Sequence, residues 1–141
     1  MTTPQPSQHQ PNNPMLIKLI WAPAAVLVLH VIAMLAGWYQ LISWLDSPMH
    51  FLGGIAIATS AYFFWNGAQI TSKQFRPILL KLLFILAIVA LAAVAWEFLE
   101  FGLDRTFGTV MQPSVQDTIK DLALGLLGGS FISAFLLYKN R

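Results

Sequence analysis

Four apolar segments, each about as long as a membrane-crossing helix, constrain the fold of this chain more than any other feature. The hydrocarbon core of a bilayer is about 30 Å thick, so a helix needs roughly 20 predominantly apolar residues to cross it. Four segments come close to this length: Leu19–Tyr39, Pro48–Trp65, Pro77–Phe101 and Ile119–Tyr138. A helix satisfies its backbone hydrogen bonds internally. We therefore predict an all-α membrane protein with four transmembrane helices in a bundle.

The composition excludes several other classes of protein. Only 10% of the residues are charged and 57% are hydrophobic, whereas soluble domains average about 25% charged residues. The chain has no long basic run, so we do not expect it to bind nucleic acid. It has no cysteine, which excludes disulfide bonds and thiolate metal sites. The lipid bilayer is therefore its expected partner.

The first 14 residues, MTTPQPSQHQPNNP, differ from the rest of the chain. They are rich in Pro, Gln, Asn and Thr and lack the apolar side chains that a folded segment buries. They also lack the charged start of a secretory signal peptide, and the apolar run that follows is too long for one. We predict a disordered polar tail over residues 1–14 and a transmembrane domain over residues 15–141, with the first helix retained as a signal anchor.

The basic residues indicate an orientation. Four crossings place both chain ends and the loop over residues 66–76 on the same side of the membrane. Six of the eight basic residues lie on that side: Lys18, Lys73, Arg76, Lys81, Lys139 and Arg141. Because Lys and Arg are enriched in cytoplasmic segments, we predict that both termini are cytoplasmic.

The acidic residues all fall at the opposite ends of the predicted helices. Acidic residues contribute little to membrane orientation, so their distribution requires another explanation. Spacings of three or four residues place most of them on shared helix faces, together with one histidine: Asp46 with His50, Glu97 with Glu100, and Asp117 with Asp121.

Small residues continue the same faces into the membrane. Gly54 follows His50 by four residues, and Gly125, Gly129 and Ser133 recur every four residues in the last segment. Small residues allow membrane helices to approach closely. We therefore predict that the faces bearing the acids pack together and form one acidic pocket near the outer leaflet.

Such a pocket suits a divalent cation. Crowded carboxylates take up protons or recruit cations. Carboxylates with an imidazole are suitable ligands for Mg²⁺, Mn²⁺, Fe²⁺ or Zn²⁺, and a bound metal can activate water for hydrolysis or transfer. Glu97, Asp121 and His50 are the candidate catalytic residues, because ionisable groups deep in a membrane helix usually serve a function. The candidate metal ligands are Asp46, His50, Glu97, Glu100, Asp117 and Asp121.

Simpler roles compete with these assignments. Asp46 precedes Ser47-Pro48 and Asp117 opens the last segment, so helix capping is the expected role of both. Asp104 lies beyond the predicted third helix, and we expect it to be solvated. His30 lies in the middle of the first segment, where we expect a hydrogen-bonded histidine rather than a ligand.

Three motifs resemble those of a known family. They are DSPMHFLGG, with Asp and His four residues apart, WEFLE, and QDTIKDLALGLLGG. This order resembles the YjdF-like family of small uncharacterised bacterial inner-membrane proteins and, more distantly, the VanZ-like family. The resemblance covers about residues 46–130 and implies a location in the bacterial inner membrane. Ser47 and Asp121 depart from the VanZ-like pattern, which favours the YjdF-like assignment.

Three classes of function remain open at this point. The pocket is either a metal-assisted enzyme site for a lipid-linked or envelope substrate, a proton or cation pathway, or a charged contact in a non-catalytic scaffold or subunit. Few polar residues lie in the inner half of the predicted bundle, which argues against a pathway. A chain this short is also compatible with a homo-oligomer or a membrane protein partner.

Overall fold

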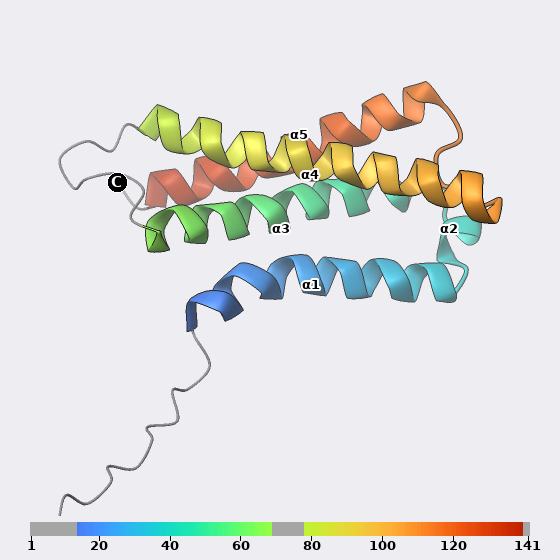
Figure 1. Cartoon of the computed structure of the whole chain (residues 1–141), viewed down its shortest axis with the longest axis horizontal. Helices are drawn as coiled ribbons and strands as arrows, with labels where there is room; N and C mark the ends of the chain where they lie inside the picture. The colour runs from blue at the N-terminus through green and yellow to red at the C-terminus, as the bar shows by residue number, and fades with distance from the viewer. Residues whose placement is uncertain (1–13, 69–77, 140–141) are drawn as a thin grey trace, which may run out of the picture.

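The computed structural model describes residues 14–68 and 78–139, and its secondary structure over these ranges is entirely helical. The helices are α1 (Pro14–Leu35), α2 (Trp38–Leu41), α3 (Asp46–Gly67), α4 (Ile78–Phe107) and α5 (Val115–Lys139). The four long helices run antiparallel in chain order, so that α1 begins and α5 ends at the same end of the bundle (Figure 1). The predicted polar tail, except Pro14, lies outside the described residues.

Three of these helices are long and apolar enough to cross a membrane. They cover Met15–Leu35, Ile78–Phe107 and Val115–Lys139. The central helix α3 has 22 residues but is not among the three. The prediction of an all-α membrane protein is therefore confirmed at the level of three candidate spans.

Two glycines set helix ends that the apolar pattern placed elsewhere. Gly37 has φ of 69° and Gly108 has φ of 68°, a left-handed conformation that favours glycine and commonly ends helices. The first helix therefore stops at Leu35, and Tyr39 lies in the separate helix α2. Helix α4 continues to Phe107, six residues past the end predicted for the third apolar segment. Asp104 therefore lies within the helix together with Glu97 and Glu100.

The closest helix packing joins α3 to α5. A Cβ atom on Gly54 would overlap the carbonyl group of Gly125, and one on Gly128 would overlap that of Phe51. Only glycine permits the two backbones to approach this closely. The predicted packing of the two glycine-bearing faces is confirmed, and it brings the start of α3 against the start of α5.

α3 is the helix around which the others are arranged. It packs against α1, α4 and α5, whereas α4 packs against α3 and α5. Away from the acidic end, a core of Ala58, Ala61, Tyr62, Ile85 and Val89 joins α3 to α4. This arrangement holds the beginnings of α3 and α5 and the end of α4 at one end of the bundle (Figure 1).

Candidate metal centre

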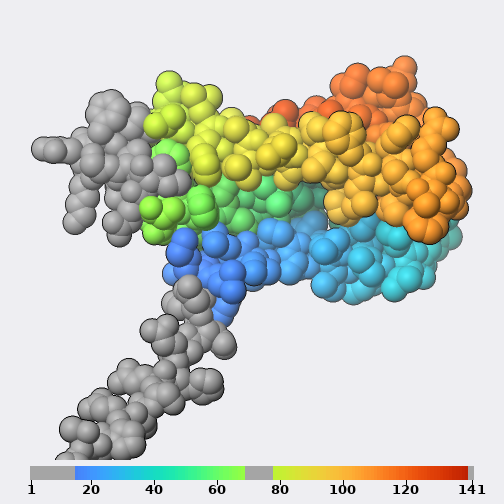
Figure 2. Space-filling view, in the orientation of Figure 1, coloured from blue at the N-terminus to red at the C-terminus, as the bar shows by residue number. Residues whose placement is uncertain are grey.

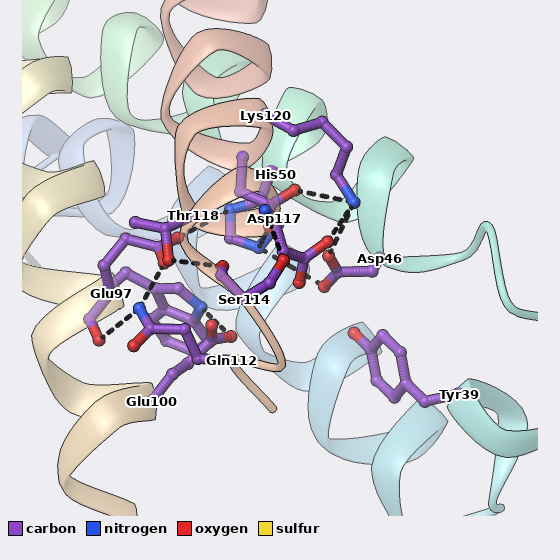
Figure 3. Close-up of polar contacts among 12 residues, drawn as sticks. Tyr39, Asp46, His50, Glu97, Glu100, Gln112, Ser114, Asp117, Thr118 and Lys120 are labelled. Carbon is purple, nitrogen blue, oxygen red and sulfur yellow. Dashed lines mark hydrogen bonds and ion pairs between the residues drawn. The ribbon is translucent and has the colours of Figure 1, made fainter. Parts of the chain in front are cut away.

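His50 lies at the centre of the acidic end, surrounded by carboxylates from three helices (Figure 3). Its Nε2 atom lies 3.4 Å from Asp46 Oδ1 and 4.0 Å from Asp121 Oδ2. Its Nδ1 atom lies 3.9 Å from Glu97 Oε1. The imidazole of α3 therefore contacts its own helix, α4 and α5 at once.

All six predicted metal-ligating residues belong to this cluster. They form three overlapping groups whose potential ligand atoms lie within 4.8 Å of one another. The groups are Asp46–His50–Glu100, His50–Glu97–Asp121 and Asp46–Asp117–Asp121. The groups are not equivalent, because some of these carboxylates already have a partner.

Two buried carboxylate oxygens lack a hydrogen-bond partner in the described part of the chain. They are Glu97 Oε1 and Asp121 Oδ1, on residues that are only 4% and 2% exposed. An unpartnered buried polar atom costs about 1–3 kcal/mol, and more when it is charged. Both residues belong to the His50–Glu97–Asp121 group. This group therefore has unused capacity for a ligand.

Lys120 already supplies a positive charge to the Asp46–Asp117–Asp121 group. Its ammonium lies 2.6 Å from Asp117 Oδ1, 3.5 Å from Asp121 Oδ1 and 3.9 Å from Asp46 Oδ2 (Figure 3). These are the three acids of the Asp46–Asp117–Asp121 group. The contact with Asp121 is an ion pair without hydrogen-bond geometry, which leaves that oxygen unsatisfied.

Glu100, in the Asp46–His50–Glu100 group, also has a hydrogen-bond donor of its own. Trp96 Nε1 donates a hydrogen bond of 2.7 Å to Glu100 Oε1. The indole of Trp96 also packs edge-on against His30, with ring centroids 5.0 Å apart. This contact connects the acidic cluster to α1.

His30 is hydrogen-bonded within the bundle, as predicted. Its Nδ1 atom lies 2.7 Å from the hydroxyl group of Tyr39. Burial, followed by the negative charge of Asp46, raises the pKa of Tyr39 to about 12. The phenol therefore keeps its proton at neutral pH, and its hydrogen bond with His30 holds α2 beside the cluster.

A loop between α4 and α5 reaches back into the site. Gln112 Nε2 donates to Glu97 Oε2 at 2.9 Å. The loop is held by Asp104, which accepts hydrogen bonds from Thr109 Oγ1 at 2.6 Å, Met111 N at 2.8 Å and Gln112 N at 2.9 Å. Asp104 lies near the end of α4 and anchors this loop, so it is more than a solvated group.

Substitution of Asp104 by alanine tests this role. Because three donors lose their acceptor, we expect faster hydrogen–deuterium exchange at the amides of Met111 and Gln112. Exchange in the core segment around Ile85 serves as the internal control and should not change. Unchanged exchange in the loop would contradict the assignment of Asp104 as its anchor.

The predicted capping roles are wrong for both candidate residues. The residue before α3 is Leu45, which makes no side-chain cap, and Asp46 is instead turned toward His50 and Lys120. At the start of α5, Ser114 Oγ accepts the hydrogen bond from the Asp117 amide at 3.1 Å. Both acids are therefore available to the cluster because other residues begin their helices.

Sequence reasoning missed three residues that shape the site: Trp96, Gln112 and Lys120. Lys120 carried a signal, because it lies three residues after Asp117 on a helix and the two can pair. Trp96 precedes Glu100 by four residues in the same way. Gln112 had no such signal, since its contact depends on the path of the loop.

Comparison with known proteins supports the membrane assignment. A family model described as "Predicted membrane protein (DUF2238)" matches residues 7–141. Searches among curated proteins and among solved structures gave no match. The family match fits the resemblance to a small membrane family at a coarse level and does not bear on the VanZ-like resemblance. Because the match extends over nearly the whole chain, this protein belongs to the DUF2238 family of predicted membrane proteins.

Proposed function

We propose that this protein binds one divalent cation between His50, Glu97 and Asp121 and uses it to act on a lipid-linked or envelope substrate. One observation carries the proposal. Glu97 Oε1 and Asp121 Oδ1 are buried and have no hydrogen-bond partner among the described residues. Both side chains approach the imidazole of His50, Glu97 through Oε1 and Asp121 through Oδ2. A cation would satisfy both oxygens at once.

The other two groups are weaker candidates because their charges are already compensated. Lys120 lies among the acids of one group, and Trp96 donates to Glu100 in the other. The cluster nevertheless contains five carboxylates, and the ammonium of Lys120 lies near only three of them. The remaining excess of negative charge favours a further cation.

The ligand set favours a transition metal. Mg²⁺ prefers oxygen ligands in an octahedral arrangement, whereas imidazole with carboxylates suits Mn²⁺, Fe²⁺ or Zn²⁺. Two ligands of a tetrahedral zinc ion lie roughly 3.3 Å apart, given bond lengths of about 2.0–2.1 Å. The 3.9 Å between His50 Nδ1 and Glu97 Oε1 would need only a small contraction.

Neighbouring residues would position these ligands. Asp46 beside Nε2 holds the imidazole in one orientation, as carboxylates do for metal-bound histidines. Gln112 holds Glu97 through its other oxygen and leaves Oε1 unused. When bound, the cation would supply Lewis acidity or an activated water.

We further propose that α3 is the fourth span and that both termini are cytoplasmic. α3 can be less apolar than the other spans because neighbouring helices cover it, and small residues such as Gly54, Ala56 and Ala58 on it are buried. The excess of basic residues at the opposite end supports a metal centre near the outer leaflet of the bacterial inner membrane.

A transport pathway is a weaker alternative. Polar side chains farther along the bundle donate to backbone carbonyls: Thr59 to Ile55, Ser60 to Leu19, and Ser133 to Gly129. Hydroxyl groups engaged in this way do not offer free positions along a path. The polar groups with unused capacity are instead concentrated at one end.

The proposal is tested by thermal unfolding of the chelated, detergent-purified protein with Mg²⁺, Mn²⁺, Fe²⁺ or Zn²⁺ added separately. Binding to the folded state alone stabilises it, by about 2.7 kcal/mol at 100 times the Kd. We expect one of the transition metals to raise the unfolding midpoint of the wild type. Glu97→Gln should abolish this shift, because the amide is a poor replacement for a carboxylate ligand.

Glu100→Gln is the matched control. It makes the same acid-to-amide change on the same helix, one turn away, at a carboxylate that Trp96 already engages. We expect it to retain the metal-dependent shift. Equal loss of the shift in both variants would indicate a general effect of charge and contradict the His50–Glu97–Asp121 assignment. A wild type whose unfolding midpoint responds to no cation would also contradict the proposal.

A further inference from the structure

A cavity of about 250 Å³ lies between α1, α3 and α4 and extends from the metal centre. Asp46, His50 and His30 line its polar part. The rest of its lining is almost entirely apolar and includes Pro23, Val26, Leu27, Ile57, Val89 and Ala92. The cavity therefore joins the carboxylate–histidine cluster to a hydrocarbon-like surface.

The position of α1 leaves this cavity accessible from the side of the bundle. α1 packs against α2 and α3, while α4 packs against α3 and α5. In the space-filling view, α3 is visible between α1 and α4 on this face (Figure 2). Because α1 and α4 are both candidate membrane spans, the opening between them faces the region that lipid chains occupy.

We infer that this cavity holds the hydrocarbon chain of a membrane lipid whose headgroup lies at the metal centre. The inference rests on the proposed function and names the class of its substrate. An amphipathic lipid has the same two parts as the cavity lining, in the same order. The surrounding bilayer supplies such a molecule at the opening without passage through water.

The size of the cavity agrees with this occupant. An apolar cavity of roughly 150 Å³ holds a benzene molecule, so the larger volume here accommodates part of a hydrocarbon chain. The polar residues would hold the headgroup at one end. The apolar lining would hold the chain through burial of its methylene groups.

Gly53 allows the cavity to be filled without disturbing the helix packing. It lines the cavity, and a Cβ atom at this position meets nothing within 4 Å. A leucine here would extend into the space assigned to the lipid chain. Gly102 provides the matched control, because its Cβ position is equally open but it lies on α4 outside the cavity lining.

The experiment uses the full chain in bilayers that contain a phospholipid with a photoreactive diazirine in one acyl chain. After irradiation, labelled positions are mapped by mass spectrometry. We expect preferential labelling of the partly buried Val26, Ile57 and Ala92 over Leu83 and Leu91, which are exposed on α4 outside the cavity. A leucine that excludes two methylene groups should reduce cavity labelling about tenfold.

Gly53→Leu should show this reduction, and Gly102→Leu should label as the wild type does. Equal labelling of cavity and outer positions in the wild type would overturn the inference without any variant. Undiminished labelling in Gly53→Leu would also overturn it. Metal-dependent stabilisation is measured on the same preparations. Its absence, with the cavity still labelled, would refute the metal proposal and leave the lipid site standing.

Discussion

Replacement of Gly54 by alanine is expected to destabilise the bundle by about 3 kcal/mol, at the upper end of the usual cost of overpacking. The new Cβ atom would overlap the Gly125 carbonyl group, which is backbone and cannot rotate away. Relief requires α3 and α5 to move apart, and this would also separate His50 from Asp121. The free energy of unfolding, measured by titration with a denaturing detergent, gives the result.

Gly53→Ala is the control, since the two glycines are adjacent on one helix and receive the same methyl group. The Cβ atom of Gly53 meets open space, and alanine is favoured over glycine within a helix by about 0.5–1 kcal/mol. We expect no loss of stability. If the two variants are equally stable, α3 and α5 do not approach as closely as described.

Replacement of Lys120 by methionine is expected to increase the number of bound divalent cations from one to two. The ammonium lies within 4 Å of the three acids that form the second carboxylate group. Its removal takes this counter-charge away from Asp46 and Asp117, and Asp121, which belongs to both ligand groups, can then bridge two cations. Isothermal titration calorimetry of the chelated protein measures the stoichiometry.

Lys120→Arg keeps the positive charge and should still bind one cation. It therefore separates the loss of charge from a change in packing. A stoichiometry of one in Lys120→Met, with the fold intact, would show that Lys120 does not take the place of a cation. Loss of all binding would instead mean that Lys120 supports the first site, contrary to the assignment of its role.

The sequence was sufficient to identify the long apolar helices and the residues that converge. Apolar length predicted four spans, of which three are candidate spans in the structure. The four-residue spacing of small residues identified the faces along which α3 and α5 pack. Glu97 and Asp121 were singled out by their depth within apolar segments, and both are nearly fully buried. These features depend on local pattern and on the cost of burying charge, which a single sequence displays.

Features that depend on the path of the chain could not be predicted in this way. Gln112 reaches Glu97 only because Asp104 holds the loop between α4 and α5. The assignments of Asp46 and Asp117 as caps failed because α3 and α5 begin one or more residues earlier than expected, and each carboxylate instead pairs with a residue one turn later on its own helix. Apolarity alone also misplaced the end of α1, because Gly37 turns the chain before Tyr39.

The dependence of α3 on α5 bears on how the protein is assembled during synthesis. α3 and α4 emerge first and carry His50 and Glu97, but the residues that close the centre, Lys120 and Asp121, belong to the last helix. The same helix supplies the glycines against which α3 packs. A chain still in synthesis therefore has neither its tightest helix contact nor a complete ligand set. If the protein binds a metal as proposed, loading follows the insertion of α5.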